Sequence, residues 1–174
     1  MDPLDGTKEF IKRNGEFTTN IGLVHNHKVI AGVVYIPVLD ELYYAISGKG
    51  AFKVANHETK RIKANSFTFD DEGLTVVCSR SHMDDMTKKF VASLKSPKLI
   101  SKGSSLKFTT IAEGKADLYP RMAPTMEWDT CAAQIILEEA GGKVVIHESE
   151  HSPVSYNKEN LLNPFFIAKG CEST

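Results

Sequence analysis

The stretch FTTNIGLVHNHKVIAGVVYIPV, residues 17–38, sets the pattern on which the fold of this chain depends. Its two runs of β-branched and aromatic residues are typical of strands, and the turn-like HNHK separates them. Short connections of this kind favour antiparallel pairing. Three similar runs follow at residues 41–47, 50–54 and 59–64. The sequence therefore predicts an antiparallel β-meander over residues 17–63.

After SFTFDDEG, residues 66–73, the pattern changes to alternating strand-like and helix-like runs. Strands are predicted at 74–79, 97–101, 116–121, 143–147 and 165–170, and helices at 83–94, 104–114 and 129–142. Such alternation predicts an α/β layer with crossover connections. The fold class is therefore α/β, with an antiparallel part at residues 1–70 and a smaller mixed part at residues 71–174.

The composition excludes several classes of protein. With 41% hydrophobic residues and a net charge of −1, the chain is neither disordered nor typical of a nucleic-acid binder. Its three cysteines are scattered, which argues against a disulfide framework. No apolar run approaches the ~18 residues of a membrane span, and no signal peptide precedes the first motif. We expect a soluble cytoplasmic protein, with peripheral association at the inner membrane face as an alternative.

The motif DPLDGT at positions 2–7 is the first candidate for chemistry. Its proline fixes one backbone dihedral and Gly6 permits a tight bend, so the carboxylates of Asp2 and Asp5 can converge. Two adjacent carboxylates repel each other unless a cation lies between them, and hard oxygen ligands suit Mg²⁺. The carbonyl of Leu4 is a further candidate ligand.

The residues that follow offer a place for an anion. Gly6, Thr7 and Lys8 present backbone N–H groups at the start of the short helical stretch KEFIK, and such a terminus attracts phosphate. The hydroxyl of Thr7 could orient a water molecule. Carboxylates beside an anion cradle indicate metal-assisted phosphate hydrolysis. Taken alone, the motif is also typical of a plain turn.

A second candidate lies in WDTCAAQIILEEAGG, residues 128–142. Asp129 is predicted to cap the helix, a role that stabilises by about 1 kcal/mol. A capping carboxylate can also face a cation with its other oxygen. The sequence leaves both roles open.

Together, DPLDGT and WDTCAAQIILEEAGG resemble the two signature motifs of the inositol monophosphatase superfamily. DPLDGTKEFIKRNGEFTTNIGLV, SRSH, GSSLKF, AEGKADLYPR and SYNKENLLNPFF resemble its 3'(2'),5'-bisphosphate nucleotidase branch, and KEF after DGT is the strongest marker. The resemblance implies a layered α/β/α/β/α sandwich, of which this chain would hold the later part.

The resemblance also implies a role for each matching residue. The Mg²⁺ ligands would be Asp2, Asp5, Asp129 and the carbonyl of Leu4. The catalytic residues would be Asp5 and Thr7. The residues holding the scissile phosphate would be Gly6, Thr7 and Lys8, beside Asp129. The residues holding the nucleotide and its second phosphate would be Ser79, His82, Gly103, Lys107 and Arg121.

Each of these residues also has a simpler interpretation when taken alone. His82 is typical of a surface or capping residue, Lys107 of a solvated helix face, and Arg121 of a strand end. Candidate helix caps are Ser104 and Ser105, and candidate core residues are Phe108 and Trp128.

The implied reaction is Mg²⁺-dependent removal of the 3'-phosphate of adenosine 3',5'-bisphosphate to give AMP, with sensitivity to lithium and a role in sulfur metabolism. Alternatives are an inositol monophosphatase-like sugar phosphatase and a non-catalytic remnant that binds metal or phosphate. Superfamily members carry a further segment before DPLDGT, with a Glu-Glu stretch and covering helices. We therefore expect a piece of a longer enzyme that is weakly active or inactive alone, exposes apolar surface, and could form a homodimer.

Overall fold

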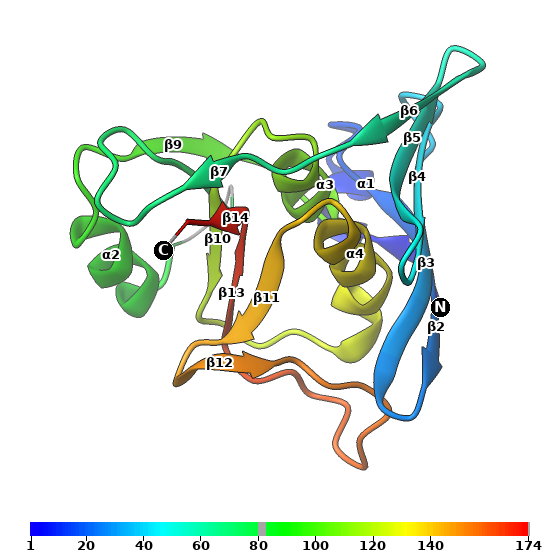
Figure 1. The fold of residues 1–174 in the computed structure, drawn as a ribbon. Coiled ribbons are helices and arrows are strands. Elements are labelled where there is room, and N and C mark those ends of the chain that lie inside the picture. Colours follow the sequence, from blue (N-terminus) through cyan, green and yellow to red (C-terminus); the bar gives the residue numbers. More distant parts are fainter. Residues whose placement is uncertain (80–82, 174) are drawn as a thin grey trace.

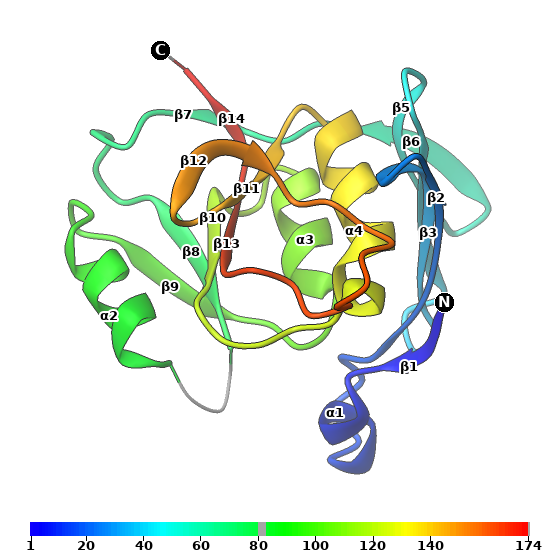
Figure 2. The same ribbon diagram turned by 90° about the horizontal axis from the view of Figure 1, so that it is seen from below.

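The computed structural model describes residues 1–79 and 83–173. Figure 1 shows two sheets with helices α3 (Leu106–Ala112) and α4 (Glu127–Glu139) between them, and α2 (Asp85–Ala92) beyond the second sheet. Figure 2 shows the same layers from below, with the short helix α1 (Thr7–Ile11) beside the first sheet. The predicted layered α/β arrangement is confirmed.

The first sheet is the predicted meander with one strand added. Its six strands pair in sequence order and are all antiparallel. They are β1 (Asp2–Asp5), β2 (Thr18–His25), β3 (Lys28–Ile36), β4 (Glu41–Ile46), β5 (Gly50–Ala55) and β6 (Glu58–Ile62). β1 was not predicted. The opening motif is therefore not the plain turn that it resembles when taken alone, but an edge strand followed by a bend.

The second sheet is mixed and has the order β12-β11-β13-β10-β8-β9. β8 is parallel to both β9 and β10, as helical crossovers through α2 and α3 require, and the remaining pairs are antiparallel. The strands are β8 (Thr75–Cys78), β9 (Lys98–Ser101), β10 (Leu118–Arg121), β11 (Lys143–Ile146), β12 (Ser149–Pro153) and β13 (Phe166–Lys169). A small separate pair joins β7 (Ser66–Phe67) to β14 (Cys171–Glu172). β7, β12 and β14 were not predicted.

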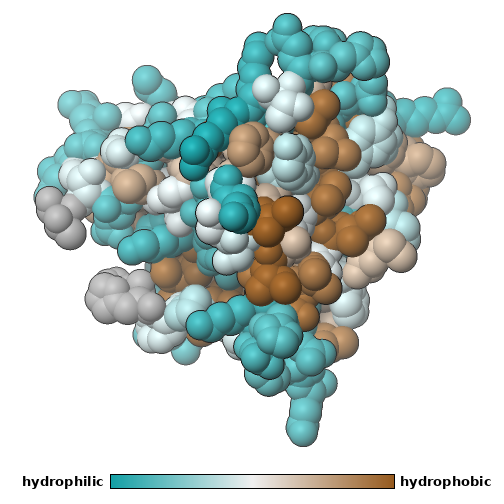
Figure 3. All heavy atoms as spheres, turned by 45° about the vertical axis from the view of Figure 1, so that its right-hand side comes forward, coloured by the Kyte–Doolittle hydropathy of each residue, from teal (hydrophilic) through white to brown (hydrophobic). Residues whose placement is uncertain are grey.

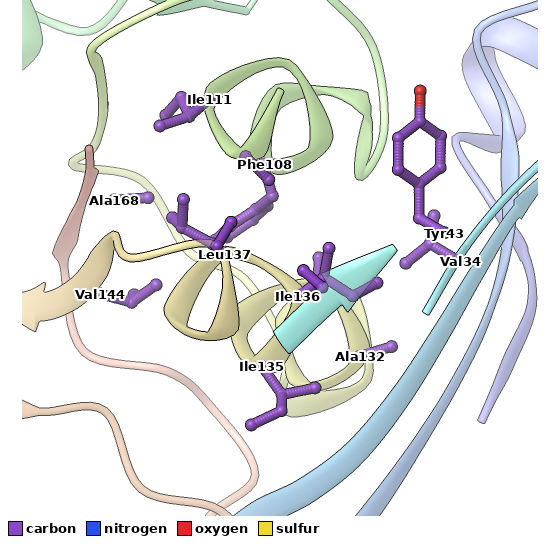
Figure 4. Close-up of a cluster of buried hydrophobic side chains, with 14 of the residues drawn as sticks. Val34, Tyr43, Phe108, Ile111, Ala132, Ile135, Ile136, Leu137, Val144 and Ala168 are labelled. Atoms are coloured by element: carbon purple, nitrogen blue, oxygen red, sulfur yellow. The ribbon is translucent and has the colours of Figure 1, made fainter. Parts of the chain in front are cut away.

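Helix α4 is the centre of the core between the two sheets (Figure 4). Ile136 and Leu137 are fully buried on it. The meander approaches this helix at two glycines: a Cβ on Gly32 would lie 2.4 Å from the carbonyl oxygen of Ala132, and one on Gly22 would lie 2.5 Å from Sγ of Cys131. The absence of side chains at these positions lets the helix lie against the sheet backbone.

Two core predictions differ in outcome. Phe108 is buried and packs against Tyr119 and Phe166, as predicted for a core residue. Trp128 is 41% exposed, so the prediction that it belongs to the core is wrong. Side chains from both residues 1–70 and 71–174 share one hydrophobic cluster, and the division between those segments stays a prediction.

The outer face of the meander is apolar and exposed. Ile21, Leu23 and Ile46 are each at least 50% exposed, and hydrophobic side chains gather on this side of the molecule in Figure 3. Contiguous apolar surface of this kind is typical of a face that another segment or molecule covers.

Candidate active site

A β-bulge in β1 brings Asp2 and Asp5 to one side of the strand. In a regular strand, residues three apart point to opposite faces. Here Asp2 pairs with Asn20 and Asp5 pairs with Thr18, so three steps along β1 match two steps along β2. The extra residue turns both carboxylates toward the same face. Because Asn20 and Thr18 are buried, this is the inner face of the sheet.

Gly6 follows this strand in a left-handed conformation, with φ of 87°. A Cβ there would lie 3.1 Å from Cβ of Ser104 and 3.2 Å from the carbonyl oxygen of Glu16. Glycine is therefore needed both for the bend and for the close approach of the neighbouring loop. Helix α1 begins at the next residue, as the stretch KEFIK predicted.

Asp129 comes to the same place from α4, but it is not the helix cap. The helix begins at Glu127 with Met126 as its N-cap, which makes Asp129 the third helical residue. Its Oδ2 accepts a hydrogen bond of 2.8 Å from the backbone N–H of Met126, so the carboxylate still satisfies a group at the helix start. The predicted cap was therefore wrong by three residues: the helix starts earlier, where the N–H of Glu127 donates to the carbonyl oxygen of Leu161 in a distant loop.

The three carboxylates meet. One oxygen from each of Asp2, Asp5 and Asp129 lies within 4.8 Å of the others. Burial, together with the charge of Asp5, raises the pKa of both Asp2 and Asp129. None of the ion pairs among the described residues involves these three side chains. Mutual repulsion that no ion pair offsets, and an all-oxygen donor set, fit a hard divalent ion such as Mg²⁺.

A cavity of about 230 Å³ opens beside this cluster. Asp5 and Asp129 form part of its wall, and cationic side chains form another part. The predicted site residues that line it are Asp5, Gly6, Lys8, Ser79, Gly103, Lys107, Arg121 and Asp129. Asp2, Leu4 and Thr7 do not line it, and Thr7 is exposed at the start of α1. His82 lies outside the described residues.

Lys107 is the most unusual of the lining residues. Only 8% of it is exposed, so the interpretation as a solvated lysine is wrong. Burial lowers its pKa to about 8, and its ammonium donates a hydrogen bond of 2.9 Å to the carbonyl oxygen of Ser104. A buried ammonium with one neutral hydrogen-bond partner retains donors for an anion in the cavity.

Arg121 also retains a hydrogen-bond donor for an anion in the cavity. One terminal nitrogen donates to the carbonyl oxygen of Pro124 at 3.1 Å, while its Nε is buried with no partner among the described residues. The two cations therefore give one side of the cavity a positive potential. Together with the carboxylates, they produce a site that is negative where a cation would bind and positive where an anion would bind.

The sequence prediction missed the residues that support Asp5. Ser104 and Ser105 were predicted as helix caps. Ser105 is the N-cap of α3 but makes no side-chain capping bond, and both hydroxyls instead lie against the Asp5 carboxylate. Thr18 and Asn20 were not predicted at all. A pattern in the sequence could have indicated them, since they are two polar residues, two positions apart, on the buried face of a strand that is otherwise rich in apolar residues.

Two sequence-based expectations concern the cysteines and the helices. Cys78, Cys131 and Cys171 are all free thiols, as their spacing predicted. Within residues 1–79 and 83–173, no helix combines the length and apolarity that a membrane crossing requires.

Comparison with known proteins places these features in a family. The model of the inositol monophosphatase family matches residues 1–165. The 3'(2'),5'-bisphosphate nucleotidase CysQ of Salmonella typhimurium is 47% identical over 167 residues, covering 95% of this chain and 65% of the relative. The crystal structure of CysQ from Bacteroides thetaiotaomicron superimposes with a TM-score of 0.88 at 45% identity, covering 97% of this chain and 68% of that one.

A more distant structure shows the same fold. SaIMPase-II, solved with inositol monophosphate bound, superimposes with a TM-score of 0.79 at 23% identity and covers 98% of this chain and 63% of that one. The matched part of the chain corresponds to only 65% of the length of the curated relative from Salmonella. Since the family model covers both the bulged opening strand and the helix that carries Asp129, the chain belongs to the inositol monophosphatase family.

Proposed function

We propose that this site hydrolyses phosphate monoesters and that its substrate is adenosine 3',5'-bisphosphate, which loses its 3'-phosphate to give AMP. The observation that carries the proposal is the convergence of Asp2, Asp5 and Asp129 beside a cavity that also holds Lys107 and Arg121. The choice of a bisphosphorylated nucleotide over a sugar phosphate is supported by the CysQ relative from Salmonella, a 3'(2'),5'-bisphosphate nucleotidase at 47% identity, and by the similar CysQ structure at 45%.

Mg²⁺ is the proposed cofactor, held by the side chains of Asp2, Asp5 and Asp129 and by the carbonyl oxygen of Leu4. When bound, such an ion polarises phosphoryl oxygens, lowers the pKa of water and stabilises charge on the leaving oxygen. The protein's contribution is to hold three carboxylates at a separation that a small cation can span.

The remaining residues bind and orient the substrate. Gly6 and Lys8 line the cavity next to Asp5, where backbone N–H groups can hold the scissile phosphate. Thr7, between them, is proposed to orient the attacking water with Asp5. Lys107 and Arg121, with Ser79, His82 and Gly103, are proposed to hold the nucleotide and its second phosphate. The two anionic groups of the substrate would thus occupy opposite sides of one cavity.

The proposal is tested by measuring phosphate release from adenosine 3',5'-bisphosphate and from inositol 1-phosphate, with Mg²⁺ present and absent. We expect slow Mg²⁺-dependent release from the nucleotide, lost in Asp129→Asn and retained in the control Asp70→Asn, whose side chain is 92% exposed. Faster release from inositol phosphate would contradict the substrate. Binding of AMP and Mg²⁺ with no turnover would support the non-catalytic alternative. Release at rates typical of efficient phosphatases would contradict the prediction of weak activity.

We also propose that the reaction takes place in the cytoplasm, where reducing conditions keep three free cysteines as thiols. A homodimer remains a proposal for the apolar outer face of the meander. Sedimentation analysis at several protein concentrations tests it, and a mass that stays monomeric throughout would contradict it.

A further inference from the structure

The two oxygens of the Asp5 carboxylate have different environments. Oδ2 lies within hydrogen-bond distance of four side-chain donors, whereas Oδ1 accepts no hydrogen bond from any described residue. The distances to Oδ2 are 2.5 Å from Ser104 Oγ, 3.0 Å from Ser105 Oγ, 3.2 Å from Asn20 Nδ2 and 3.3 Å from Thr18 Oγ1. One oxygen is therefore saturated by the protein, and the other is available.

The donors also fix one another. Asn20 Nδ2 donates to Ser105 Oγ at 2.9 Å as well as to Asp5, so its two hydrogens have separate acceptors. Thr18 has a single hydroxyl hydrogen and lies 2.9 Å from Asn20 Oδ1 and 2.6 Å from Ser104 Oγ. Its main effect is thus to orient Asn20 and Ser104, which contact Asp5 more closely.

Because the network is buried, each of its side chains depends on the others for its hydrogen bonds. Thr18, Asn20 and Ser105 are at most 2% exposed, so bulk water cannot replace a lost partner. The fourth member, Ser104, has a φ of 47°, a left-handed conformation that residues other than glycine rarely adopt. This unfavourable backbone holds the hydroxyl of Ser104 against Oδ2.

Three separate parts of the chain build the arrangement. The bulge in β1 places Asp5 opposite Thr18, and Asn20 follows two residues later on the same face of β2. The loop before α3 contributes both serines, and Ser105 Oγ also lies 3.3 Å from the carbonyl oxygen of Asp129 on α4. The network therefore contacts the elements that carry both Asp5 and Asp129.

We propose that Thr18, Asn20, Ser104 and Ser105 are positioning residues that hold Oδ2 of Asp5, so that Oδ1 is the oxygen presented to the divalent cation. This inference rests on the proposed metal site. Residues that orient metal ligands typically change metal affinity by about 10–100-fold when they are replaced. We expect that range for the loss of the two serine hydroxyls, although neither serine is proposed to touch the cation.

The test is a titration with Tb³⁺, followed by luminescence sensitised through Trp128, the single tryptophan of the chain and the neighbour of Asp129 in sequence. Competition with Mg²⁺ then gives the affinity for the proposed ion. The variants are Ser104→Ala, Ser105→Ala and the double variant. The matched control is Thr110→Val, which removes a buried hydroxyl of α3 that donates to the carbonyl oxygen of Leu106.

We expect the double variant to bind both ions 10–100-fold more weakly while its thermal unfolding in EDTA stays close to that of the control. A second pair separates positioning from packing. Thr18→Val keeps the shape and loses the hydroxyl, so it should weaken binding. Thr18→Ser keeps the hydroxyl and loses a methyl group, so it should reduce stability but retain affinity.

Unchanged affinity in the double serine variant, with binding lost in Asp5→Asn, would overturn the inference. So would failure of the unmodified chain to bind Tb³⁺ and Mg²⁺. Binding that depends on the serines, in a chain that releases no phosphate, would support the inference and contradict only the proposed hydrolase activity.

Discussion

Two clusters of carboxylates join the meander to helices of the middle layer, and they differ in what lies between the charges. In the lysine-bridged cluster, Glu41 on β4 and Glu113 at the end of α3 share Lys53, whose ammonium lies 2.7 Å and 2.8 Å from them. In the aspartate cluster of Asp2, Asp5 and Asp129, no described lysine or arginine lies within ion-pair distance, although Lys107 and Arg121 act on it from farther away. The first cluster is neutralised within the fold, and the second is not.

The pKa shifts of the carboxyl groups in the two clusters differ in direction. Burial alone would raise the pKa of Glu113, but hydrogen bonds from Lys115, Lys53 and Tyr43 outweigh it and lower that pKa. Burial raises the pKa of Asp129, and the carboxylates of Asp5 and Asp2 raise it further. The comparison indicates that the lysine-bridged cluster stabilises the fold, whereas the charges of the aspartate cluster fit the proposed metal site.

The largest expected effect on stability comes from removing the built-in cation. Lys53→Met leaves Glu41 without an ion pair beside Glu113, which keeps only Lys115, and the single hydroxyl hydrogen of Tyr43 can be donated to only one of the two carboxylates at a time. We expect the free energy of unfolding to fall by about 3 kcal/mol, the lower end for an unpaired buried charge. Denaturant unfolding measures it, and Lys49→Met in an exposed turn is the control. A loss below 0.5 kcal/mol, on the scale of exposed pairs, would mean that the cluster is unimportant.

The second prediction concerns the divalent cation proposed for the aspartate cluster. Mg²⁺ at about 100 times its Kd should stabilise the unmodified chain by about 2.7 kcal/mol, and Asp129→Asn should abolish that gain. In EDTA the same variant should be no less stable than the unmodified chain, because it removes repulsion and its Oδ1 can still accept from Met126. Thermal unfolding with and without Mg²⁺ measures both effects. Equal stabilisation of the variant by Mg²⁺ would place the cation elsewhere.

The smallest expected effect is an opposite response to pH in the absence of metal. Glu113 has a lowered pKa, so its stabilisation is present above its usual value of 4.5 and is lost as the pH falls through the lower folded value. Asp129 has a raised pKa, so stability is lost as the pH rises from its usual value of 3.8 through the higher folded value. Between pH 3 and 8 in EDTA, Glu113→Gln should lose stability relative to the unmodified chain as the pH rises, and Asp129→Asn should gain it. Parallel curves for the two variants would contradict the distinction.

The sequence predicted more of the fold than of the site geometry. Strands and helices with strong patterns, such as the meander and α4, were predicted because their hydrophobic periodicity is local. β1 was missed because it contains a proline and depends on pairing with β2 across α1. β12 was missed because its residues lack a strand pattern of their own and pair with β11.

Within the site, the identity of the residues could be predicted and their environment could not. Asp2, Asp5 and Asp129 were found by motif, and their convergence is present in the structure. The burial of Lys107 depends on packing of α3 against β10, and the support of Asp5 by Ser104 depends on a loop that is 99 residues away in sequence. Contacts of that range leave no local pattern.

The most direct test is anomalous diffraction from crystals of this chain soaked in Mn²⁺, which prefers the same oxygen ligands as Mg²⁺. We predict a peak between Asp2, Asp5 and Asp129, with Oδ1 of Asp5 as its ligand and Oδ2 still held by the two serines. A structure in which Asp129 points away from the opening strand, or in which Mn²⁺ binds only at other carboxylates, would contradict the metal site and the phosphatase proposal with it.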